Sequence, residues 1–326
     1  MRDNRPGHRD TGARRRRSAM TVIALDIGAT KFAAATVNTA GVTGNPWRIA
    51  VPESGVWDAC RELLVAVAGG ETVTAVGIGS AGPVDVRTGY AGPLNIAEWA
   101  GGFGLVEAVR ELFPDADIRF AIDGVCLALA EQRWGAARGV DDALCMTVSS
   151  GIGGGLISDG RVVMGRTGNA GHVGHIVVPG NEEPCACGGF GCVEAVASGM
   201  SSVRWARRQG WGGSTGVELS KDAATGDAVA LAALERAGTA LGRAIASAAA
   251  LLDTDLVVVG GGFAQSGEPL WRPLRKAAAA HAKLIFLREL RVVPSELTDQ
   301  ATLQGAAILA LGAANAGETP RGRMTS

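Results

Sequence analysis

One histidine and three cysteines lie within a short stretch of this chain, and they constrain its fold more than any other feature. The stretch spans residues 172–194 and reads HVGHIVVPGNEEPCACGGFGCVE, with His175 ten residues ahead of a C-x-C-G-x-x-G-C cluster. Zinc binds thiolate and imidazole ligands in tetrahedral geometry, and a site with four protein ligands is structural rather than catalytic. We therefore predict a structural Zn²⁺ site in this stretch. Its ligands would be His175, Cys185, Cys187 and Cys192.

The alternative for these cysteines is a glycine-rich loop whose thiols are buried or disulfide-bonded. Three cysteines cannot all pair with one another, which favours a metal. The remaining three, Cys60, Cys126 and Cys145, lie in apolar surroundings, and we expect them to be reduced, buried thiols. Reduced thiols are typical of cytoplasmic proteins, so we expect a cytoplasmic location.

Composition is that of an ordinary globular enzyme, with 326 residues, 47% hydrophobic and 19% charged. This length allows two domains or one large one. No apolar run reaches the roughly 18 to 20 residues that span a bilayer, so we expect no membrane association. Residues 1–20 hold seven arginines and two aspartates, and because the whole chain carries −1, the remainder carries about −6.

This arginine-rich beginning is interpreted as a disordered basic tail, residues 1–19, with Met20 as a possible true start of the chain. A signal peptide would place an apolar segment and a small-residue cleavage site after the charges, whereas here a strand and a glycine turn follow. The alternative is a basic arm that grips nucleic acid. We expect no nucleic-acid partner, because the arginine cluster is short and the rest of the chain is acidic.

The first glycine turn follows an apolar strand. Residues 21–37 read as strand, turn and returning strand, and the turn is D-I-G-A-T-K. Gly28 lets the main chain approach a phosphate, and Thr30 and Lys31 can donate hydrogen bonds to its oxygens; a plain hairpin turn is the alternative. Residues 55–69 have helical periodicity and end at two glycines.

Two further glycine turns follow apolar strands at residues 143–148 and 255–259. The first runs from residue 149 to residue 155 and is followed by a predicted strand at 156–163. Backbone N–H groups in such turns can bind phosphate oxygens, although glycine hairpins are common without that role. Residues 199–252 are expected to be helical, with a surface loop near 209–222. The expected phosphate and nucleotide contacts in these two turns are Ser149, Ser150, Gly151, Gly153, Gly260, Gly261 and Gly262.

Candidate substrate contacts lie after the predicted strand at residues 73–79. Ser80 opens a turn of small residues that leaves room for a ligand, and Asn95 can both donate to and accept from vicinal hydroxyls. Trp99, four residues later, is either a ligand contact or a packing residue. A helix is expected at residues 103–113.

Asp123 is the candidate catalytic residue. It follows a predicted strand at residues 118–122 and opens a helix that reads GVCLALAEQRWG. A carboxylate at that point can accept the proton of a substrate hydroxyl. The alternative is that Asp123 only caps the helix.

The run G-H-x(9)-C-x-C-G-x-x-G-C-x-E, together with the three glycine turns, resembles the ROK family of sugar kinases and repressors. The resemblance covers about residues 21–314. It implies a two-lobed α/β fold of the actin-like ATPase (ribonuclease H-like) type, with ATP as phosphoryl donor and Mg²⁺ beside the phosphates. It also implies that Asp26 lies near the metal-bound phosphates, that His175 and Glu194 reach substrate hydroxyls, and that Asp123 is the general base.

The same resemblance implies how the lobes divide the chain. We expect a small lobe at residues 20–122, on which a final helix at 302–314 packs back, and a large lobe at 123–301 that holds the zinc loop. Residues 315–326 are expected to be a disordered tail. Most members of this family are dimers, so a homodimer is possible.

Two positions depart from the family pattern. Ile122 replaces the usual asparagine before the catalytic aspartate, and His172 replaces the usual glutamate. A site that loses hydrogen-bonding partners discriminates against the substrate that needs them. We therefore expect a modified hexose, for example the amino sugar kanosamine, or a C7-cyclitol of the valienone or valiolone type, phosphorylated in an antibiotic pathway.

Three alternatives stay open on the sequence. They are an ordinary glucokinase or N-acetylhexosamine kinase, a catalytically inactive sugar-binding relative, and a sugar-responsive repressor. A repressor needs a DNA-binding segment of about 60 residues before the first strand, and only 20 residues precede Thr21. The sequence does not distinguish ATP from polyphosphate as donor, nor does it identify the substrate.

Overall fold

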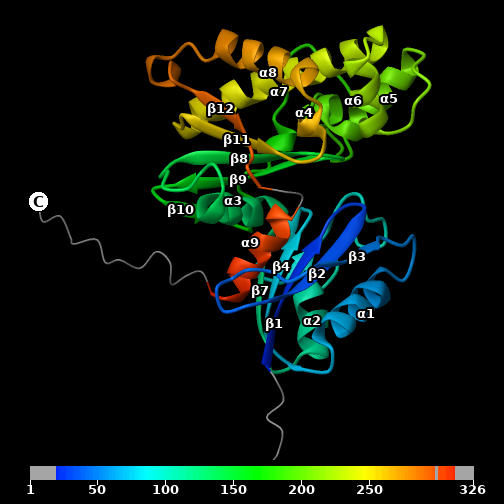
Figure 1. Cartoon of the computed structure of the whole chain (residues 1–326), viewed down its shortest axis with the longest axis vertical. Helices are drawn as coiled ribbons and strands as arrows, with labels where there is room; N and C mark the ends of the chain where they lie inside the picture. The colour runs from blue at the N-terminus through cyan, green and yellow to red at the C-terminus, as the bar shows by residue number, and fades with distance from the viewer. Residues whose placement is uncertain (1–19, 298–299, 313–326) are drawn as a thin grey trace, which may run out of the picture.

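The chain folds into two sheets stacked along the long axis of the molecule (Figure 1). The computed structural model describes residues 20–297 and 300–312. The predicted tails at residues 1–19 and 315–326, and the last two residues of the predicted 302–314 helix, lie outside the described residues. Both sheets have five strands, in the order β3-β2-β1-β4-β7 in the first and β10-β9-β8-β11-β12 in the second.

The two sheets share one connectivity. In each, the first three strands along the chain pair antiparallel and the last two add in parallel, so the second sheet repeats the plan of the first. The strands of the first sheet are β1 (Met20–Ile27), β2 (Lys31–Val37), β3 (Trp47–Ala50), β4 (Thr72–Ser80) and β7 (Asp117–Ile122). Those of the second are β8 (Ala143–Val148), β9 (Ile152–Ser158), β10 (Arg161–Val163), β11 (Leu256–Gly260) and β12 (Arg291–Pro294).

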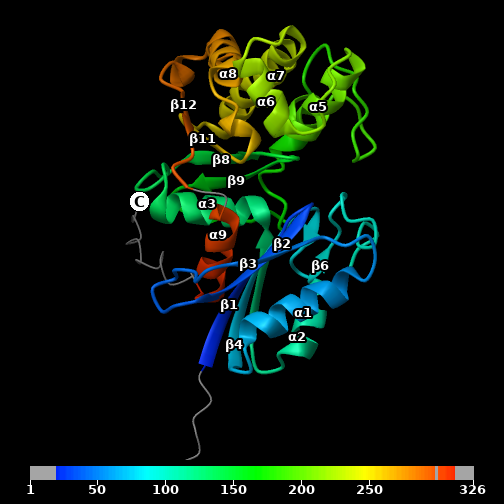
Figure 2. The same cartoon turned by 45° about the vertical axis from the view of Figure 1, so that its right-hand side comes forward.

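Helices cover both faces of the first sheet. Figure 2 shows α1 (Val56–Ala68) and α2 (Leu105–Leu112) on one side and α9 (Ala301–Ala310) on the other. Because α9 follows β12 in the chain and packs on β1 and β4, the last described helix returns to the first sheet. A short hairpin of β5 (Val84–Asp85) and β6 (Tyr90–Ala91) leaves the end of β4.

Helix α3 (Asp123–Trp134) lies between the two sheets and joins their cores. Val125 packs in the core of the first sheet, while Leu127 packs in the core that underlies the second. The first turn of α3 touches β9 backbone to backbone, since a side chain at Gly124 would overlap the carbonyl of Gly154. This contact holds the start of α3, and with it Asp123, against the second sheet.

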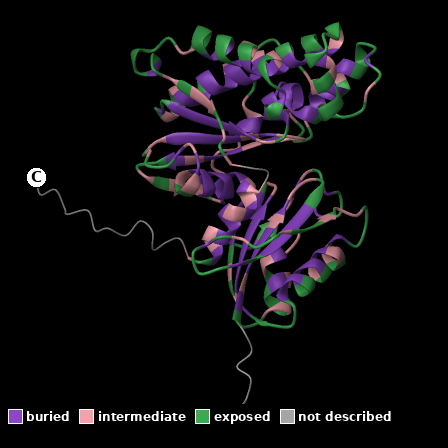
Figure 3. Cartoon of the chain, viewed as in Figure 1, coloured by how far each residue is buried: buried purple, intermediate pink, exposed green. Residues whose placement is uncertain are grey.

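The far face of the second sheet carries α7 (Ala228–Leu252) and α8 (Glu268–His281). Figure 3 shows the buried residues concentrated in the two sheets and on the inner sides of the helices. Three shorter helices complete this half: α4 (Val193–Ala197), α5 (Gly199–Arg208) and α6 (Gly216–Ala224). Single helical turns lie at η1 (Val173–His175), η2 (Phe263–Gln265) and η3 (Ile285–Leu287).

Several local predictions are wrong in detail. The glycines at residues 153–155 lie inside β9 rather than in a turn, where they leave room for α3. The predicted strand at 156–163 is broken by a tight turn at Asp159 and Gly160, both with positive φ. The predicted loop at 209–222 contains most of α6, which Thr215 and Glu218 cap reciprocally. The hairpin at 21–37 and the helix at 55–69 are confirmed within one or two residues.

The cysteines outside the zinc loop behave as predicted. Cys60, Cys126 and Cys145 are buried and form no disulfide. Burial raises the pKa of Cys60 to about 12, which keeps its thiol protonated. In the part of the chain that the structure describes, no helix combines the length and the apolar character needed to cross a membrane.

Candidate functional site

A cavity of about 250 Å³ lies between the two sheets, where the ends of β1, β8 and β11 and the start of α3 converge. Its walls include residues from both sheets, so it brings together segments more than two hundred residues apart. The predicted site residues that line it are Asp26, Gly28, Thr30, Lys31, Asn95, Asp123, Ser149, Ser150, Gly151, Gly153, His172, His175, Glu194, Gly260, Gly261 and Gly262.

Ser80 is the predicted substrate residue that does not line this cavity. Its side chain is fully buried at the end of β4, and its hydroxyl donates to the carbonyl of Ala81 at 2.9 Å. Ala81 and Gly82 line the cavity in its place.

Asp123 is the first residue of α3, and its carboxylate is held at the cavity wall. The backbone N–H of Gly124 donates to Oδ1 at 2.7 Å. The pKa of Asp123 is raised to about 6, mainly by burial; the Gly124 hydrogen bond lowers it and the charge of Glu194 raises it. Ile122 occupies the N-cap position and no side chain caps the helix, so capping does not explain the aspartate. The geometry suits a base that is ionised at neutral pH yet can accept a proton.

Asp26, at the end of β1, faces the same cavity. Burial and then the charge of Asp123 raise its pKa to about 7, while Lys31 and Arg48 lower it. The charge of Asp123 disfavours ionisation of Asp26, and a cation beside Asp26 would relieve this repulsion. Mg²⁺ takes oxygen ligands and usually combines one or two carboxylates with substrate phosphates, so Asp26 fits its requirements.

The zinc loop brings the four predicted ligands together. Nδ1 of His175 lies 3.8 Å from Sγ of Cys185, and Sγ of Cys187 lies 3.8 Å from Sγ of Cys192. All four donor atoms lie within 4.8 Å of one another. With a Zn–S bond of about 2.3 Å, sulfurs at two corners of a tetrahedron are about 3.8 Å apart, so the donor set fits Zn²⁺. The disulfide alternative is wrong, because all three cysteines are free.

His175 connects this cluster to the cavity. Its Nδ1 faces the cysteines and its side chain also lines the cavity. A metal bound at Nδ1 leaves the proton on Nε2, so the imidazole presents a fixed N–H donor on the far side of its ring. Glu194, two residues after Cys192, accepts a hydrogen bond at Oε2 from the backbone N–H of Ile152 at 2.7 Å. Oε1 forms no hydrogen bond with any described residue, so it can accept one from a ligand.

His172 is the unusual group in the wall. Its ring centroid lies 5.2 Å from that of His175, and both of its nitrogens are buried without a hydrogen-bond partner among the described residues. Burial, and then the neighbouring His175, lower its pKa, so the ring is neutral at pH 7. A buried polar group without a partner costs free energy, which a ligand that pairs with it would recover.

Asn95 sits on a loop that aromatic packing fixes. Trp99 is 1% exposed and stacks between Phe32 and Phe103, with ring centroids 5.9 Å and 4.6 Å apart. Trp99 is therefore a packing residue rather than a ligand contact. Because Phe32 directly follows Lys31, this stack also ties the Asn95 loop to the first glycine turn.

A second, larger cavity of about 1220 Å³ adjoins the first, and the sequence did not predict it. The two share Ser149, Ser150, Gly262 and Gln265. Helices α5 and α6 form most of its wall, which is mainly apolar. The sequence predicts a helix followed by a surface loop in this region, and no motif indicates a cavity; the capping pair at residues 215 and 218 is the only sequence signal for the second helix.

Comparison with known proteins gives consistent matches. The model of the ROK family matches residues 22–313. A glucokinase of Thermotoga maritima is 32% identical over 311 residues, which cover 88% of this chain and 96% of the relative. An N-acetylmannosamine kinase of Escherichia fergusonii is 32% identical over 299 residues, with coverage of 90% and 99%. A solved ROK family glucokinase from Streptomyces griseus, in complex with glucose and AMPPNP, is 32% identical with a TM-score of 0.77, covering 89% of this chain and 99% of that one.

Proposed function

Since the chain belongs to the ROK family of sugar kinases, we propose that it transfers the γ-phosphoryl group of ATP to the primary hydroxyl of a hexose-like substrate bound between its two sheets. The predicted actin-like ATPase fold is confirmed by the solved ROK kinase that it resembles. The observation that carries the proposal is the meeting of three features in one cavity. A half-buried aspartate, a histidine that belongs to the Cys/His cluster and three glycine-containing segments all line it.

The nucleotide would occupy both cavities. The triphosphate would lie against the glycine segments of the first cavity, where Thr30 and Lys31 offer hydrogen-bond donors. The neutral adenosine would lie in the mainly apolar second cavity, which adjoins the first at the residues that line both. Mg²⁺ held near Asp26 would neutralise charge on the phosphates. Phosphoryl transfer needs mostly such positioning and charge neutralisation, which fits this site.

Asp123 would accept the proton of the primary hydroxyl as that oxygen attacks the γ-phosphorus. The new bond is oxygen to phosphorus, the bond that breaks joins the γ-phosphorus to the bridging oxygen, and ADP leaves. Nε2 of His175 would donate to a ring hydroxyl and Glu194 would accept from one, so the ring is held while its primary hydroxyl faces Asp123. The zinc cluster would act only by fixing His175 and the loop that ends in Glu194.

The substrate would be a modified hexose, such as an amino sugar of the kanosamine type, or a C7-cyclitol of the valienone or valiolone type. Of the two departures from the family pattern only His172 lines the cavity, because Ile122 is 2% exposed and lies behind Gly82. The wall therefore has a neutral imidazole in place of a carboxylate. Such a wall suits an altered ring or a carbonyl better than the hydroxyls of glucose. The second candidate is glucose or an N-acetylhexosamine, favoured by the relatives, a glucokinase and an N-acetylmannosamine kinase.

A phosphorylation screen separates these candidates. ADP formation would be followed with glucose, mannose, N-acetylmannosamine, N-acetylglucosamine, kanosamine and valienone-type cyclitols, with ATP and with polyphosphate as donors. We expect kcat/KM for kanosamine or a valienone-type cyclitol to exceed those for glucose and the N-acetylhexosamines by at least tenfold. Equal or better turnover of glucose would remove the modified-substrate proposal, and no turnover of any sugar would remove the kinase proposal. A homodimer stays a prediction.

A further inference from the structure

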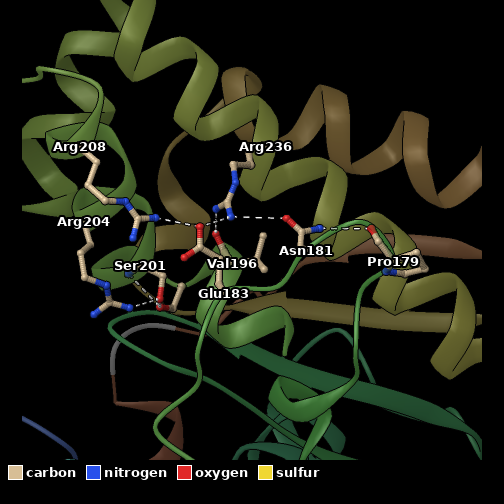
Figure 4. A network of polar contacts seen from close by, with 9 residues as sticks. Pro179, Asn181, Glu183, Val196, Ser201, Arg204, Arg208 and Arg236 are labelled. Atoms are coloured by element: carbon tan, nitrogen blue, oxygen red, sulfur yellow. Dashed lines mark hydrogen bonds and ion pairs between the residues drawn. The ribbon is translucent and has the colours of Figure 1, made fainter. Parts of the chain in front are cut away.

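A network of arginines contacts the zinc loop, residues 175–192, and the start of α5 (Figure 4); two of its members, Arg204 and Arg208, also line the second cavity. Its centre is Arg236 on α7, whose guanidinium reaches two segments that border the substrate site. One is the zinc loop, through Glu183. The other is the short helix α4, through the carbonyl of Val196.

The contacts of Arg236 are well directed. Nη1 donates to the carbonyl of Val196 at 2.7 Å, and Nη2 donates to Oε1 of Glu183 at 3.1 Å. The guanidinium also lies 5.6 Å from the ring centroid of Trp205 on α5. A planar guanidinium with fixed donors can satisfy two acceptors and stack on a ring at once, which a lysine cannot.

The hydrogen bond from Arg236 to Val196 stabilises helix α4. It has five residues, so nearly all its carbonyls lack partners within the helix, and Arg236 binds one of them. Glu194 lies in the first turn of α4, two residues after the ligand Cys192. Any rotation of so short a helix moves the Glu194 carboxylate at the cavity wall.

Glu183 makes the arrangement electrostatically stable. Its Oε1 also accepts from Nη2 of Arg208 on α5 at 2.8 Å, so one carboxylate oxygen lies between two guanidiniums. The side chains of Arg236 and Glu183 are 19% and 23% exposed, whereas that of Arg208 is 51% exposed. Burial lowers the pKa of Arg236, as does the charge of Arg208, and Glu183 opposes both. Without Glu183 two cations would face each other.

We propose that Arg236 is a positioning residue for substrate binding, which clamps the zinc loop through Glu183 and helix α4 through Val196, and so sets the position of Glu194. The inference rests on the proposed function of the cavity. Arg236 touches neither substrate nor metal and lines neither cavity. Its effect on catalysis is therefore entirely through Glu194 and the loop that carries His175 and the cysteines.

The kinetic test uses Arg236→Gln, Arg236→Lys and Glu183→Gln in the full chain. Two charge-matched controls are available. Arg243 lies two turns further along α7, and among the described residues its guanidinium makes one hydrogen bond, to the carbonyl of Pro179 at 3.4 Å. Glu182 is exposed, and its side chain forms no hydrogen bond or ion pair with the described residues. We expect Arg236→Gln to raise the sugar KM about tenfold. Its ATP KM should stay within twofold of the wild-type value, and it should still bind one zinc per chain. Arg243→Gln and Glu182→Gln should match the wild type.

Two further measurements keep the proposal falsifiable. The double variant of Glu183→Gln and Arg236→Gln should be no worse than Arg236→Gln alone, because both remove the same clamp. A folded Arg236→Lys protein with an unchanged sugar KM, or an Arg236→Gln protein whose sugar and ATP KM rise together, would overturn the positioning role.

Zinc release to a chromophoric chelator tests the clamp without any substrate. Glu183→Gln should release zinc at least fivefold faster than Glu182→Gln. Equal release rates would overturn the clamp even if the enzyme is a sugar kinase. Conversely, if the wild type phosphorylates no sugar, the proposed function fails while the release rates still decide whether the clamp exists.

Discussion

Replacing Asp123 by asparagine is expected to slow phosphoryl transfer strongly and, at the same time, to stabilise the folded protein at neutral pH. Asparagine keeps an oxygen that can accept the Gly124 hydrogen bond at 2.7 Å, so the local geometry is preserved. It cannot accept a proton. A general base typically contributes 10² to 10⁴ in rate, so we expect kcat to fall by about that factor.

The stabilisation follows from the pKa of Asp123, which rises from 3.8 to about 6 on folding. Each pKa unit corresponds to 1.36 kcal/mol, so ionising this carboxyl costs the folded state at most about 3 kcal/mol at pH 7.5. The pKa of Asp123 is higher in the folded state than in the unfolded state. The free energy of unfolding of the wild type therefore falls as pH rises from about 4 through about 6. The advantage of the asparagine variant is therefore full above pH 6 and shrinks to about 1 kcal/mol at pH 4.5.

The assay combines ADP release at pH 7.5 with thermal unfolding at pH 4.5 and 7.5. A gain of 3 kcal/mol corresponds to a rise in Tm of roughly 5 °C in a chain of this size, and the rise should be smaller at pH 4.5. Asp115→Asn is the control, because Asp115 is exposed and its side chain binds no described residue. Activity within tenfold of the wild type would refute the assignment of the base. An asparagine variant with the Tm of the wild type at both pH values would show that ionised Asp123 does not destabilise the folded protein.

Three further predictions follow from the same site. The wild-type kcat/KM for sugar should fall about tenfold between pH 7.5 and pH 5, because the pKa of Asp123 is about 6 and its protonated form cannot act as a base; a profile flat over this range would contradict it. Removing zinc with a chelator should raise the sugar KM at least tenfold, with recovery when Zn²⁺ is restored, and metal analysis should find one zinc per chain; sugar binding that survives complete removal would show that the loop does not depend on the metal. His172→Glu should raise kcat/KM for glucose at least tenfold relative to that for the preferred substrate, as measured in the same screen, because the carboxylate restores an acceptor for ring hydroxyls; unchanged selectivity would exclude His172 as a specificity residue.

The features that the sequence predicted best are those set by local spacing. The zinc ligands lie within eighteen residues, and the chemistry of three thiols and an imidazole admits few alternatives. Asp123 is placed by a strand and a helix that both have clear patterns. Trp99 could not be assigned from sequence, because an aromatic residue near a loop packs or binds with equal ease, and only the stack with Phe32 and Phe103 decides it.

The features that the sequence could not predict depend on contacts between distant segments. The glycines at 153–155 resemble a turn until α3 is seen to press on β9. Ser80 lies at a strand end, where a shift of one residue reverses the direction of the side chain, so Ala81 faces the cavity instead. The second cavity and the pair of Glu183 and Arg236 join segments 50 or more residues apart, and no local pattern records such a contact.

The most direct test is a crystal structure of the protein with AMPPNP and the best substrate from the screen. We predict that the primary hydroxyl lies about 2.6 to 3.2 Å from a carboxylate oxygen of Asp123 and faces the γ-phosphorus. Ring hydroxyls should lie within the same range of Nε2 of His175 and of Glu194, with Zn²⁺ bound behind them. A substrate bound with its primary hydroxyl away from Asp123, or held by neither His175 nor Glu194, would contradict the account.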